Sequence, residues 1–252
     1  MLIKKKYNYT DETWHLVANN ENVWIKWRFE VINKFLKELS IDLRKKKMCV
    51  DVGSGHGNFA KKLESISHFK IDQFDVINNS NLRDKTRGKF YLHDINKKNK
   101  KFKNKYDILF LLDVLEHIKN PQIFLNACKY YLKKDGILII NVPAVPALFS
   151  DYDNAVGHLR RYNKKSISRL LYKSKFKIMK ITYWGLLLLP VLFIRTMGLL
   201  IFKPSKRNII KKGMNTKNTL VRFIMEILFF LEFYIFKFGF YGTSLLTIIK
   251  RK

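Results

Sequence analysis

Short apolar runs recur through the middle of the chain, and segments with helical spacing separate several of them. Two runs, 108–112 and 137–140, are continuously apolar, as expected of strands buried on both faces. Helical patterns cover Asn58–Ser65 and Pro121–Leu132. Strands that alternate with helices predict an α/β fold with a parallel sheet covered on both faces. The expected strands are Met48–Val52, Lys70–Val76, Lys89–Leu92, Asp107–Leu112 and Gly136–Val142.

The pattern changes at both ends of this core. Residues 1–45 form a polar segment with helical spacing, and its tryptophans either stack on a ligand as a lid or simply pack. Residues 242–252 contain one more expected strand. We therefore predict a single domain, 1–252, with a helical lid (1–45), a core (46–182), an apolar helical insertion (183–241) and a last strand (242–252). The tryptophans are Trp14, Trp24 and Trp27.

The insertion consists of two apolar stretches joined by a basic loop. Tyr183–Phe202 contains Arg195 as its single charge and would reach about 30 Å as one helix. Leu220–Phe238 is also apolar, although it carries four charged residues. Central charges argue against two membrane spans, so the alternatives are helices in a membrane interface or helices packed on the protein itself. The charged residues of the second stretch are Arg222, Glu226, Glu232 and Lys237.

Composition narrows the class of protein. An apolar fraction of 47% supports a core and excludes a mainly disordered chain. Two cysteines exclude a disulfide scaffold, and no His/Cys spacing predicts a metal site. Lys and Arg total 49 against 20 Asp and Glu, giving a net charge of +29, which favours an anionic membrane surface or a nucleic acid as partner. The first residues lack an apolar signal region, which predicts the cytoplasm.

A glycine-rich loop follows the first expected strand. The sequence Val-Asp-Val-Gly-Ser-Gly-His-Gly begins at Val50 and places Gly53, Gly55 and Gly57 before the helix that starts near Asn58. Glycines permit a sharp turn and let a ligand lie against bare backbone, while the helix N-terminus offers free N–H groups.

Acidic residues accompany the loop. Asp51 precedes it, Asp75 ends the next strand at the position that faces the ribose of a nucleotide-like cofactor, and Asp94 follows the third strand. The loop lacks the Lys-Ser/Thr pair of a phosphate-binding loop. The pattern therefore suits an adenosine that carries an amino acid better than a pyrophosphate.

With these motifs the chain resembles the class I S-adenosylmethionine-dependent methyltransferases. Val50–Gly57 is similar to the family's first motif, Tyr106–Ile118 to its fourth-strand motif and Leu132–Pro143 to its fifth-strand entry. The resemblance implies a Rossmann-like, seven-stranded sheet with an antiparallel last strand and S-adenosylmethionine as cofactor. Asp75 would bind the ribose, Asp94 would lie on the adenine side, and Asp113 in the fourth-strand motif would join the cofactor site.

A narrower resemblance concerns the acceptor. The segment Gly157–Tyr162, the Trp-rich segment Glu21–Arg28 and the ending Gly-Thr-Ser-Leu-Leu resemble a bacterial subgroup often seen among envelope-glycan genes. It implies a small-molecule acceptor, lipid-linked or related to envelope glycans.

Two polar clusters are candidates for the acceptor side. Asp113, Glu116 and His117 have i, i+3, i+4 spacing, which predicts one shared helical face where ligands bind, or a merely structural turn. The second cluster follows the fifth strand. There His158 would act as a base and Arg161 would bind an anionic acceptor, or Asp153 would pair with Arg161 in a solvated loop. The isolated histidines His15, His68 and His93 are interpreted as ordinary surface or edge residues.

Three functions follow. The first is a methyltransferase at the inner face of the cytoplasmic membrane, acting on a small-molecule or lipid-linked acceptor. The second is an RNA methyltransferase, although the spread of the basic residues makes nucleic acid the less favoured partner. The third is a binding protein that has kept the fold without the chemistry.

Overall fold

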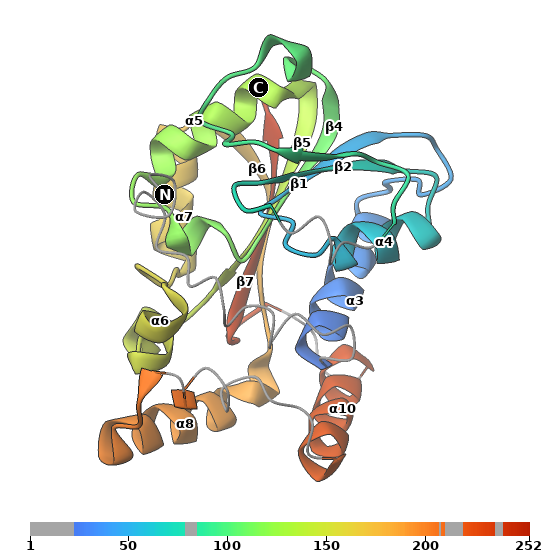
Figure 1. The fold of residues 1–252 in the computed structure, drawn as a ribbon. Helices are drawn as coiled ribbons and strands as arrows, with labels where there is room; N and C mark the ends of the chain where they lie inside the picture. The colour runs from blue at the N-terminus through green and yellow to red at the C-terminus, as the bar shows by residue number, and fades with distance from the viewer. Residues whose placement is uncertain (1–22, 79–84, 207, 210–218, 235–238) are drawn as a thin grey trace.

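The described part of the chain is built around one seven-stranded sheet of order β3-β2-β1-β4-β5-β7-β6, with helices on both faces (Figure 1). The computed structural model describes residues 23–78, 85–206, 208–209, 219–234 and 239–252. The strands are β1 (Met48–Val52), β2 (Lys70–Asp75), β3 (Phe90–Leu92), β4 (Tyr106–Leu112), β5 (Leu132–Pro143), β6 (Phe176–Trp184) and β7 (Ser244–Arg251).

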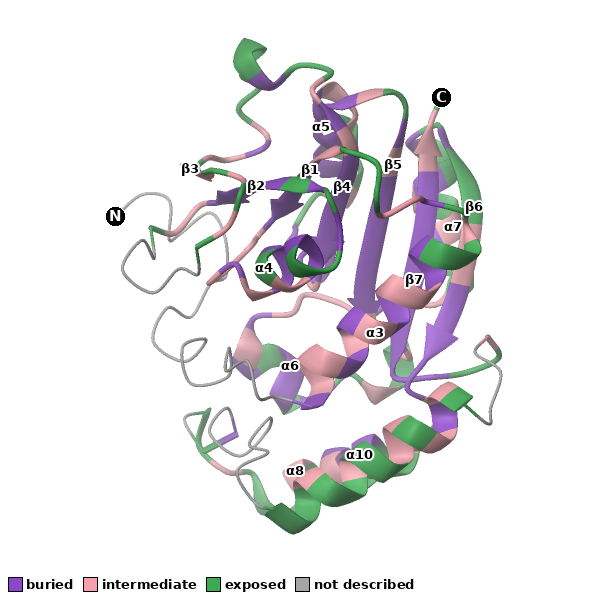
Figure 2. Ribbon diagram, turned by 90° about the vertical axis from the view of Figure 1, so that its right-hand side faces the viewer, coloured by how far each residue is buried: buried purple, intermediate pink, exposed green. Residues whose placement is uncertain are grey.

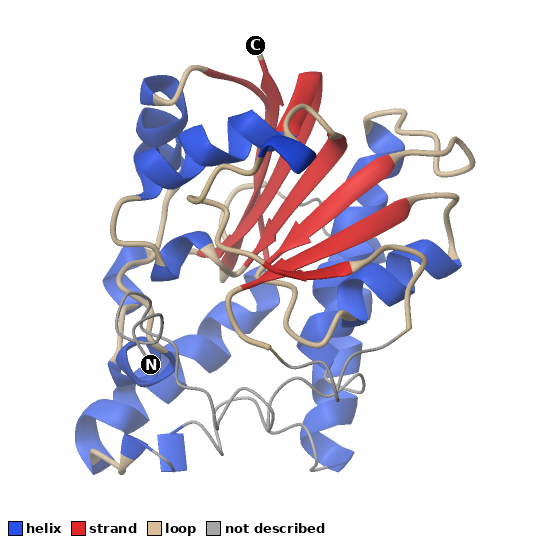
Figure 3. Cartoon of the chain, turned by 45° about the horizontal axis from the view of Figure 1, so that its top comes forward, coloured by secondary structure: helices blue, strands red, loops and turns tan. Residues whose placement is uncertain are grey.

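Strand direction confirms the predicted fold class. Strands β1 to β5 pair in parallel, whereas β7 runs antiparallel to both β5 and β6. The continuous apolar runs of β4 and of the second half of β5 are almost entirely buried, as predicted. The carboxyl ends of the parallel strands meet at one edge (Figure 3). This edge is where open parallel sheets bind ligands.

Helices bury one apolar layer on each face of the sheet. Helices α3 and α4 share a core cluster with β1 and β4, and α5 and α7 share another with β4 and β5 on the opposite face. Segment 23–38 of the expected lid is thus helix α3, which packs in the core. The helices are α3 (Val23–Glu38), α4 (Asn58–Ser65), α5 (Pro121–Tyr131), α6 (Asp151–Val156), α7 (Lys164–Lys173), α8 (Leu189–Phe202) and α10 (Thr219–Tyr234).

The tryptophans of α3 pack against the protein, which is the second of the two roles considered above. Trp24 stacks on Trp184 with ring centroids 4.5 Å apart, and Trp27 contacts both Trp184 and Phe229. Trp14 and His15 lie outside the described residues.

The first apolar stretch is not the single 20-residue helix that its composition suggested. Strand β6 continues to Trp184, two residues beyond the expected end of the core. The chain then turns at Gly185, which has a φ of 81°, and α8 begins at Leu189. No helix within the described ranges is both long and apolar enough to cross a membrane.

Helices α8 and α10 extend from the sheet edge and leave much apolar surface exposed (Figures 1 and 2). Their charged residues face inward or pair with each other. Arg195 lies 4.1 Å from the ring centroid of Tyr152 in α6. Glu232 is 1% exposed and accepts hydrogen bonds from the backbone N–H groups of Gly185 and Leu187. Arg195 and Glu232, two of the charges that argued against membrane spans, thus contact the protein itself, whereas Arg222 and Glu226 pair with each other and stay partly exposed on α10.

Candidate functional site

The glycine loop connects β1 to α4 as the sequence predicts. Gly53 and Gly57 have φ values of 71° and 85°, which glycine tolerates best. The Gly53 N–H donates to the carbonyl of Phe74 at 2.8 Å, which ties the loop to β2. A Cβ on Gly53 would lie 2.7 Å from a methyl carbon of Val114, so a side chain there would crowd the turn after β4. The loop is thus held close against two strand ends.

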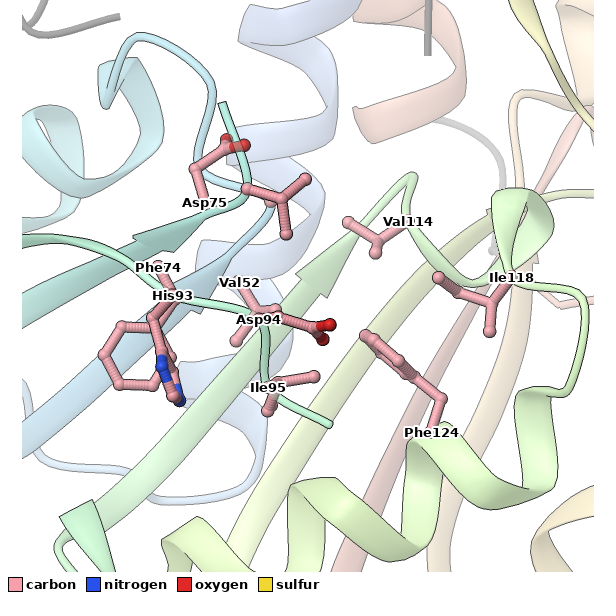
Figure 4. A pocket seen from close by; sticks show the side chains of 11 residues that line it. Val52, Phe74, Asp75, His93, Asp94, Ile95, Val114, Ile118 and Phe124 are labelled. Atoms are coloured by element: carbon pink, nitrogen blue, oxygen red, sulfur yellow. The ribbon is translucent and has the colours of Figure 1, made fainter. Parts of the chain in front are cut away.

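A pocket opens beside this loop, at the carboxyl ends of β1, β2 and β4. Its walls are largely apolar, and Asp75 and Asp94 are its acidic lining residues; Figure 4 shows Asp94 directed toward the space beside Phe124 and Val114. Apolar walls with a few polar groups are typical of sites that bind a flat organic ring. The lining comprises Val52, Gly53, Phe74, Asp75, Val76, His93, Asp94, Ile95, Val114, Ile118 and Phe124.

Three of the predicted cofactor residues, Gly53, Asp75 and Asp94, line this pocket. Asp75 also stabilises the loop, because its carboxylate accepts from the Gly55 N–H at 2.9 Å and the Ile77 N–H at 3.0 Å. The other four predicted residues lie outside the pocket lining. Asp51 is 3% exposed within β1, Gly55 and Gly57 shape the loop, and Asp113 lies beyond the end of β4.

Asp113 does not share a helical face with Glu116 and His117, so that prediction is wrong. Its φ of 58° is left-handed, and the 3₁₀ turn that follows contains just Leu115–His117. The Asp113 carboxylate accepts from the Asn141 side-chain amide at 2.7 Å and pairs with Arg28 of α3. Asp113 therefore joins α3 to the sheet next to the site.

The polar cluster after β5 is a buried network. The fully buried Asp153 accepts from the Nδ1 of His158 at 2.8 Å and from the Nε of Arg161 at 2.9 Å. Burial alone would raise the pKa of Asp153, but the hydrogen bond from His158 and the charge of Arg161 outweigh it and lower the pKa. Arg161 is 7% exposed and also donates to the carbonyl of Ala144. The pairing predicted as the alternative is present, although in the interior and not in a solvated loop.

Backbone hydrogen bonds bring the two clusters together. The Leu159 N–H donates to the carbonyl of Glu116 at 2.9 Å, and the Nδ1 of His117 bonds the carbonyl of Gly157 at 2.9 Å. The rings of His117 and His158 consequently meet edge to face, 4.9 Å apart. Burial, reinforced by His158, lowers the pKa of His117 to about 4, so its ring is neutral at pH 7.

Glu116 is the unusual member of the joined cluster. Its side chain is fully buried, and neither carboxylate oxygen has a hydrogen-bond partner among the described residues. Burial and the nearby Asp113 raise its pKa. Within the part of the chain that the structure describes, the Nε2 of His158 lies 3.7 Å from the carboxylate, which is too long for a hydrogen bond.

Sequence reasoning missed two features of the site. His93, which the sequence pattern makes an ordinary surface or edge residue, lines the pocket, and its Nε2 bonds the hydroxyl of Tyr131 at 2.8 Å. The buried state of Glu116 was also missed. A histidine immediately before Asp94 was the available signal for the first feature, whereas nothing in the local sequence indicates the second.

The pocket suits the donor that the motifs predict. The close loop leaves bare backbone at Gly53, the pocket walls are largely apolar, and Asp75 and Asp94 are its acidic lining residues.

Comparison with known proteins agrees with this geometry. A family model described as a methyltransferase domain matches residues 24–181. The ubiquinone biosynthesis O-methyltransferase of Glaesserella parasuis serovar 5 is 46% identical over 37 residues, which cover 15% of this chain and 16% of the relative. The chain therefore matches less than a fifth of that curated relative's length.

Solved methyltransferase structures share the fold at low identity. An S-adenosylmethionine-dependent methyltransferase from Mesorhizobium loti has a TM-score of 0.56 and 11% identity, covering 94% of this chain and all of that chain. The 1,6-didemethyltoxoflavin-N1-methyltransferase of Burkholderia thailandensis, solved with S-adenosylhomocysteine, has a TM-score of 0.52 and 11% identity, covering 86% and 74%. Because the family model spans more than half of its residues, this chain belongs to the S-adenosylmethionine-dependent methyltransferases.

Proposed function

We propose that this methyltransferase acts on a small-molecule acceptor, lipid-linked or related to envelope glycans, at an anionic membrane surface. The observation that carries the proposal is the exposed apolar face of α8 and α10. Soluble monomers rarely expose a contiguous apolar surface of this kind without a partner. Its most exposed aliphatic and aromatic members are Ile194, Ile201 and Phe202 of α8 and Leu220, Phe223 and Tyr234 of α10.

The position of this face supports the proposal. Trp184, at the end of β6, pairs with Ser244, which in turn pairs with Pro143 at the carboxyl end of β5. Helix α8 starts five residues after Trp184, and the Glu232 carboxylate of α10 accepts a hydrogen bond from the Gly185 N–H. The apolar face is therefore anchored at the sheet edge that also carries the cofactor pocket. A membrane that contacts these helices would lie at the same edge of the sheet as the donor pocket, so an acceptor held in the membrane would be close to the donor.

Charge around the face favours an anionic surface. Lys203 and Lys206 follow α8 and are exposed, and Lys212 and Lys217 belong to the same linker in the sequence. Interfacial helices bind by burying apolar area while basic residues contact anionic head groups. The relative that is named for ubiquinone biosynthesis agrees with a small-molecule acceptor.

We assign the donor pocket to the residues that line it. Asp75 and Asp94 would hold the ribose and adenine sides of the donor, and Gly53 would let it approach the backbone. Asp51, Gly55, Gly57 and Asp113 would support the loop and the strand ends around it. When bound, S-adenosylmethionine supplies a methyl group that its sulfonium has already activated.

On the acceptor side, the protein must align the nucleophile, exclude water and, where the nucleophile carries a proton, help to remove it. His117 and His158 are the groups suited to this task, because each uses Nδ1 in a hydrogen bond and thereby directs Nε2 elsewhere. Asp153 and Arg161 are positioning residues that hold His158. Since Arg161 is buried and bonded to Asp153, we propose this role in place of direct contact with an anionic acceptor.

Labelled methyl transfer into a membrane lipid extract tests the function. The full chain is incubated with methyl-labelled donor and extract, and the products are analysed by mass spectrometry. We expect label in an extractable small molecule with the wild-type protein and a loss of at least about tenfold with Asp94→Asn. Label found in added RNA and not in the extract would contradict the proposal and favour the RNA alternative.

Vesicle pelleting tests the membrane contact separately. We expect the wild-type protein to pellet with vesicles containing anionic lipid, and the double variant Ile194→Ser/Ile201→Ser to stay largely in the supernatant. The control is Ile123→Ser in α5, which removes an isoleucine of similar exposure, 63%, from outside α8 and α10. Equal pelleting of the double variant and the control would exclude this face as the membrane contact.

A further inference from the structure

We infer that Glu116, His117 and His158 form a binding site for one divalent transition-metal ion, such as Zn²⁺, beside the donor pocket. One nitrogen or oxygen from each side chain lies within 4.8 Å of the others. Ligand atoms around a tetrahedral ion with bonds of about 2.1 Å are about 3.4 Å apart, so small side-chain rotations suffice to close the site.

The buried carboxylate of Glu116 is the observation that points to a ligand. A buried charged group without a hydrogen bond is unfavourable and requires a proton, an ion or a partner. The neighbouring carboxylates are compensated, since Asp113 pairs with Arg28 and Asp153 with Arg161. Glu116 is the acid in this cluster without a short ion pair among the described residues. A bound cation would complete the local charge balance.

Both histidines are oriented as metal ligands usually are. The Nδ1 of His158 is fixed by the Asp153 carboxylate, and the Nδ1 of His117 by the carbonyl of Gly157, each at 2.8–2.9 Å. A metal-binding histidine almost always gives its other ring N–H to a carboxylate or a carbonyl, which sets the tautomer and directs Nε2 to the ion. The Nε2 of His158 already faces the Glu116 carboxylate.

The donor set indicates which ions fit. Two imidazoles and one carboxylate favour Zn²⁺ and its first-row neighbours over Mg²⁺ and Ca²⁺, which prefer oxygen ligands alone. Three protein ligands leave a coordination position open, as in catalytic sites. A local His/Cys spacing, the signal sought in the sequence, does not reveal this site. His158 is distant in sequence from Glu116 and His117, and the fold brings the three together.

The position gives the ion a use that rests on the proposed function. The ligands Glu116 and His117 lie between Val114 and Ile118, and both of these line the donor pocket. An acceptor oxygen or nitrogen at the open position would lie near the donor, and the ion would lower the pKa of a bound hydroxyl. In that state His117 and His158 would serve as ligands, and the ion would favour loss of the acceptor's proton.

Metal titration of the untagged full chain tests the site. After dialysis against a chelator, the protein is titrated with Co²⁺, read by its visible absorption, and with Zn²⁺ in competition with a chromophoric chelator. We expect one equivalent to bind, and a loss of affinity of at least tenfold in Glu116→Gln and His158→Gln. The removal of the orienting carboxylate in Asp153→Asn should weaken binding about tenfold to a hundredfold.

The control is His68→Gln, which removes an exposed histidine and should leave the affinity and the one-to-one stoichiometry unchanged. Thermal melting verifies that each variant folds. If His158→Gln unfolds, Glu116→Gln, which preserves side-chain shape, still tests the site. The inference is overturned if the wild type binds no stoichiometric metal, or if Glu116→Gln and His158→Gln bind it as tightly as wild type. Calorimetry also measures binding of S-adenosylmethionine to the metal-free protein. If the donor binds although no metal does, the metal site is excluded and the proposed function is unaffected.

Discussion

Gly53 illustrates how a single residue determines whether the pocket can hold a donor. It lines the pocket, its φ of 71° is unfavourable for other residues, and an added methyl group would press on Val114. Backbone strain of about 1–2 kcal/mol accompanies a non-glycine residue in this region. Gly53→Ala should therefore weaken the binding of S-adenosylmethionine at least about tenfold in a calorimetric titration.

Gly198 provides the matched control within the same chain. It lies inside α8, and a Cβ added there would meet no atom within 4 Å. Gly198→Ala should leave donor affinity unchanged and stabilise the fold by about 0.5–1 kcal/mol, because alanine favours the helix. If both variants bound the donor as tightly as wild type, the pocket beside the loop would not be the donor site.

Asn141 has an equally specific role in stability. Its buried side-chain amide donates to Asp113 at 2.7 Å, and its carbonyl oxygen accepts from the indole N–H of Trp184 at 2.9 Å. Asn141→Ala leaves both partners without these bonds, and we expect the free energy of unfolding in urea to fall by about 2–4 kcal/mol. Asn126→Ala, at an exposed position of α5, should change it by less than about 0.5 kcal/mol. If Asn141→Ala and Asn126→Ala lowered the free energy of unfolding equally, the two hydrogen bonds of Asn141 would make no measurable contribution to stability.

At the scale of elements, α10 is attached to the end of β6 through Glu232. Its buried carboxylate accepts from two backbone N–H groups, and burial outweighs these bonds and raises its pKa above the ordinary 4.5. A group with a raised pKa in the folded state binds its proton more tightly there than in the unfolded state. Its stabilising contribution is thus fully present below pH 4.5 and is lost as the pH rises through the raised pKa.

Comparison of wild type with Glu232→Gln isolates this effect, because glutamine does not titrate. The melting temperature of wild type relative to the variant should fall as the pH rises from about 4.5 to about 8. Glu226→Gln, at an exposed position of the same helix, corrects for changes common to the whole protein. If instead the melting temperature of wild type rose relative to that of Glu232→Gln over this range, the carboxylate would be stabilised in its charged form.

Elements differ in how well the sequence predicted them, and the reasons are physical. The conformations of β1, the glycine loop and α4 are determined by residues adjacent in the sequence, so the pattern of this segment can be recognised from the sequence alone. Strand β6 was missed because it lies at the edge of the sheet, where Lys177 and Lys180 interrupt its apolar residues and the first half of the strand is largely exposed. The apolar stretch beyond it contains a turn at Gly185, which hydropathy alone does not detect.

The site shows the same limit at longer range. Asp75 ends β2 and Asp94 follows β3 in the parallel part of the sheet, so the topology alone brings them to the edge where Gly53 lies. The cluster of Glu116 and His158 instead depends on a backbone bond between Leu159 and Glu116, which no sequence spacing encodes. Residues placed by sheet topology could be predicted, whereas those placed by one loop contact could not.

For the molecule as a whole, the net charge of +29 and the apolar face of α8 and α10 make separable contributions to the proposed membrane contact. Charge attraction acts over a Debye length, which shrinks from about 10 Å at 0.1 M salt to about 3 Å at 1 M, whereas apolar burial is little weakened by salt. Binding to anionic vesicles should therefore decline over this range and retain a salt-resistant fraction. That fraction should be absent in Ile194→Ser/Ile201→Ser and present in Ile123→Ser. Complete release of wild type at 1 M salt would mean that charge alone holds the protein, as expected of nonspecific adsorption by a basic chain.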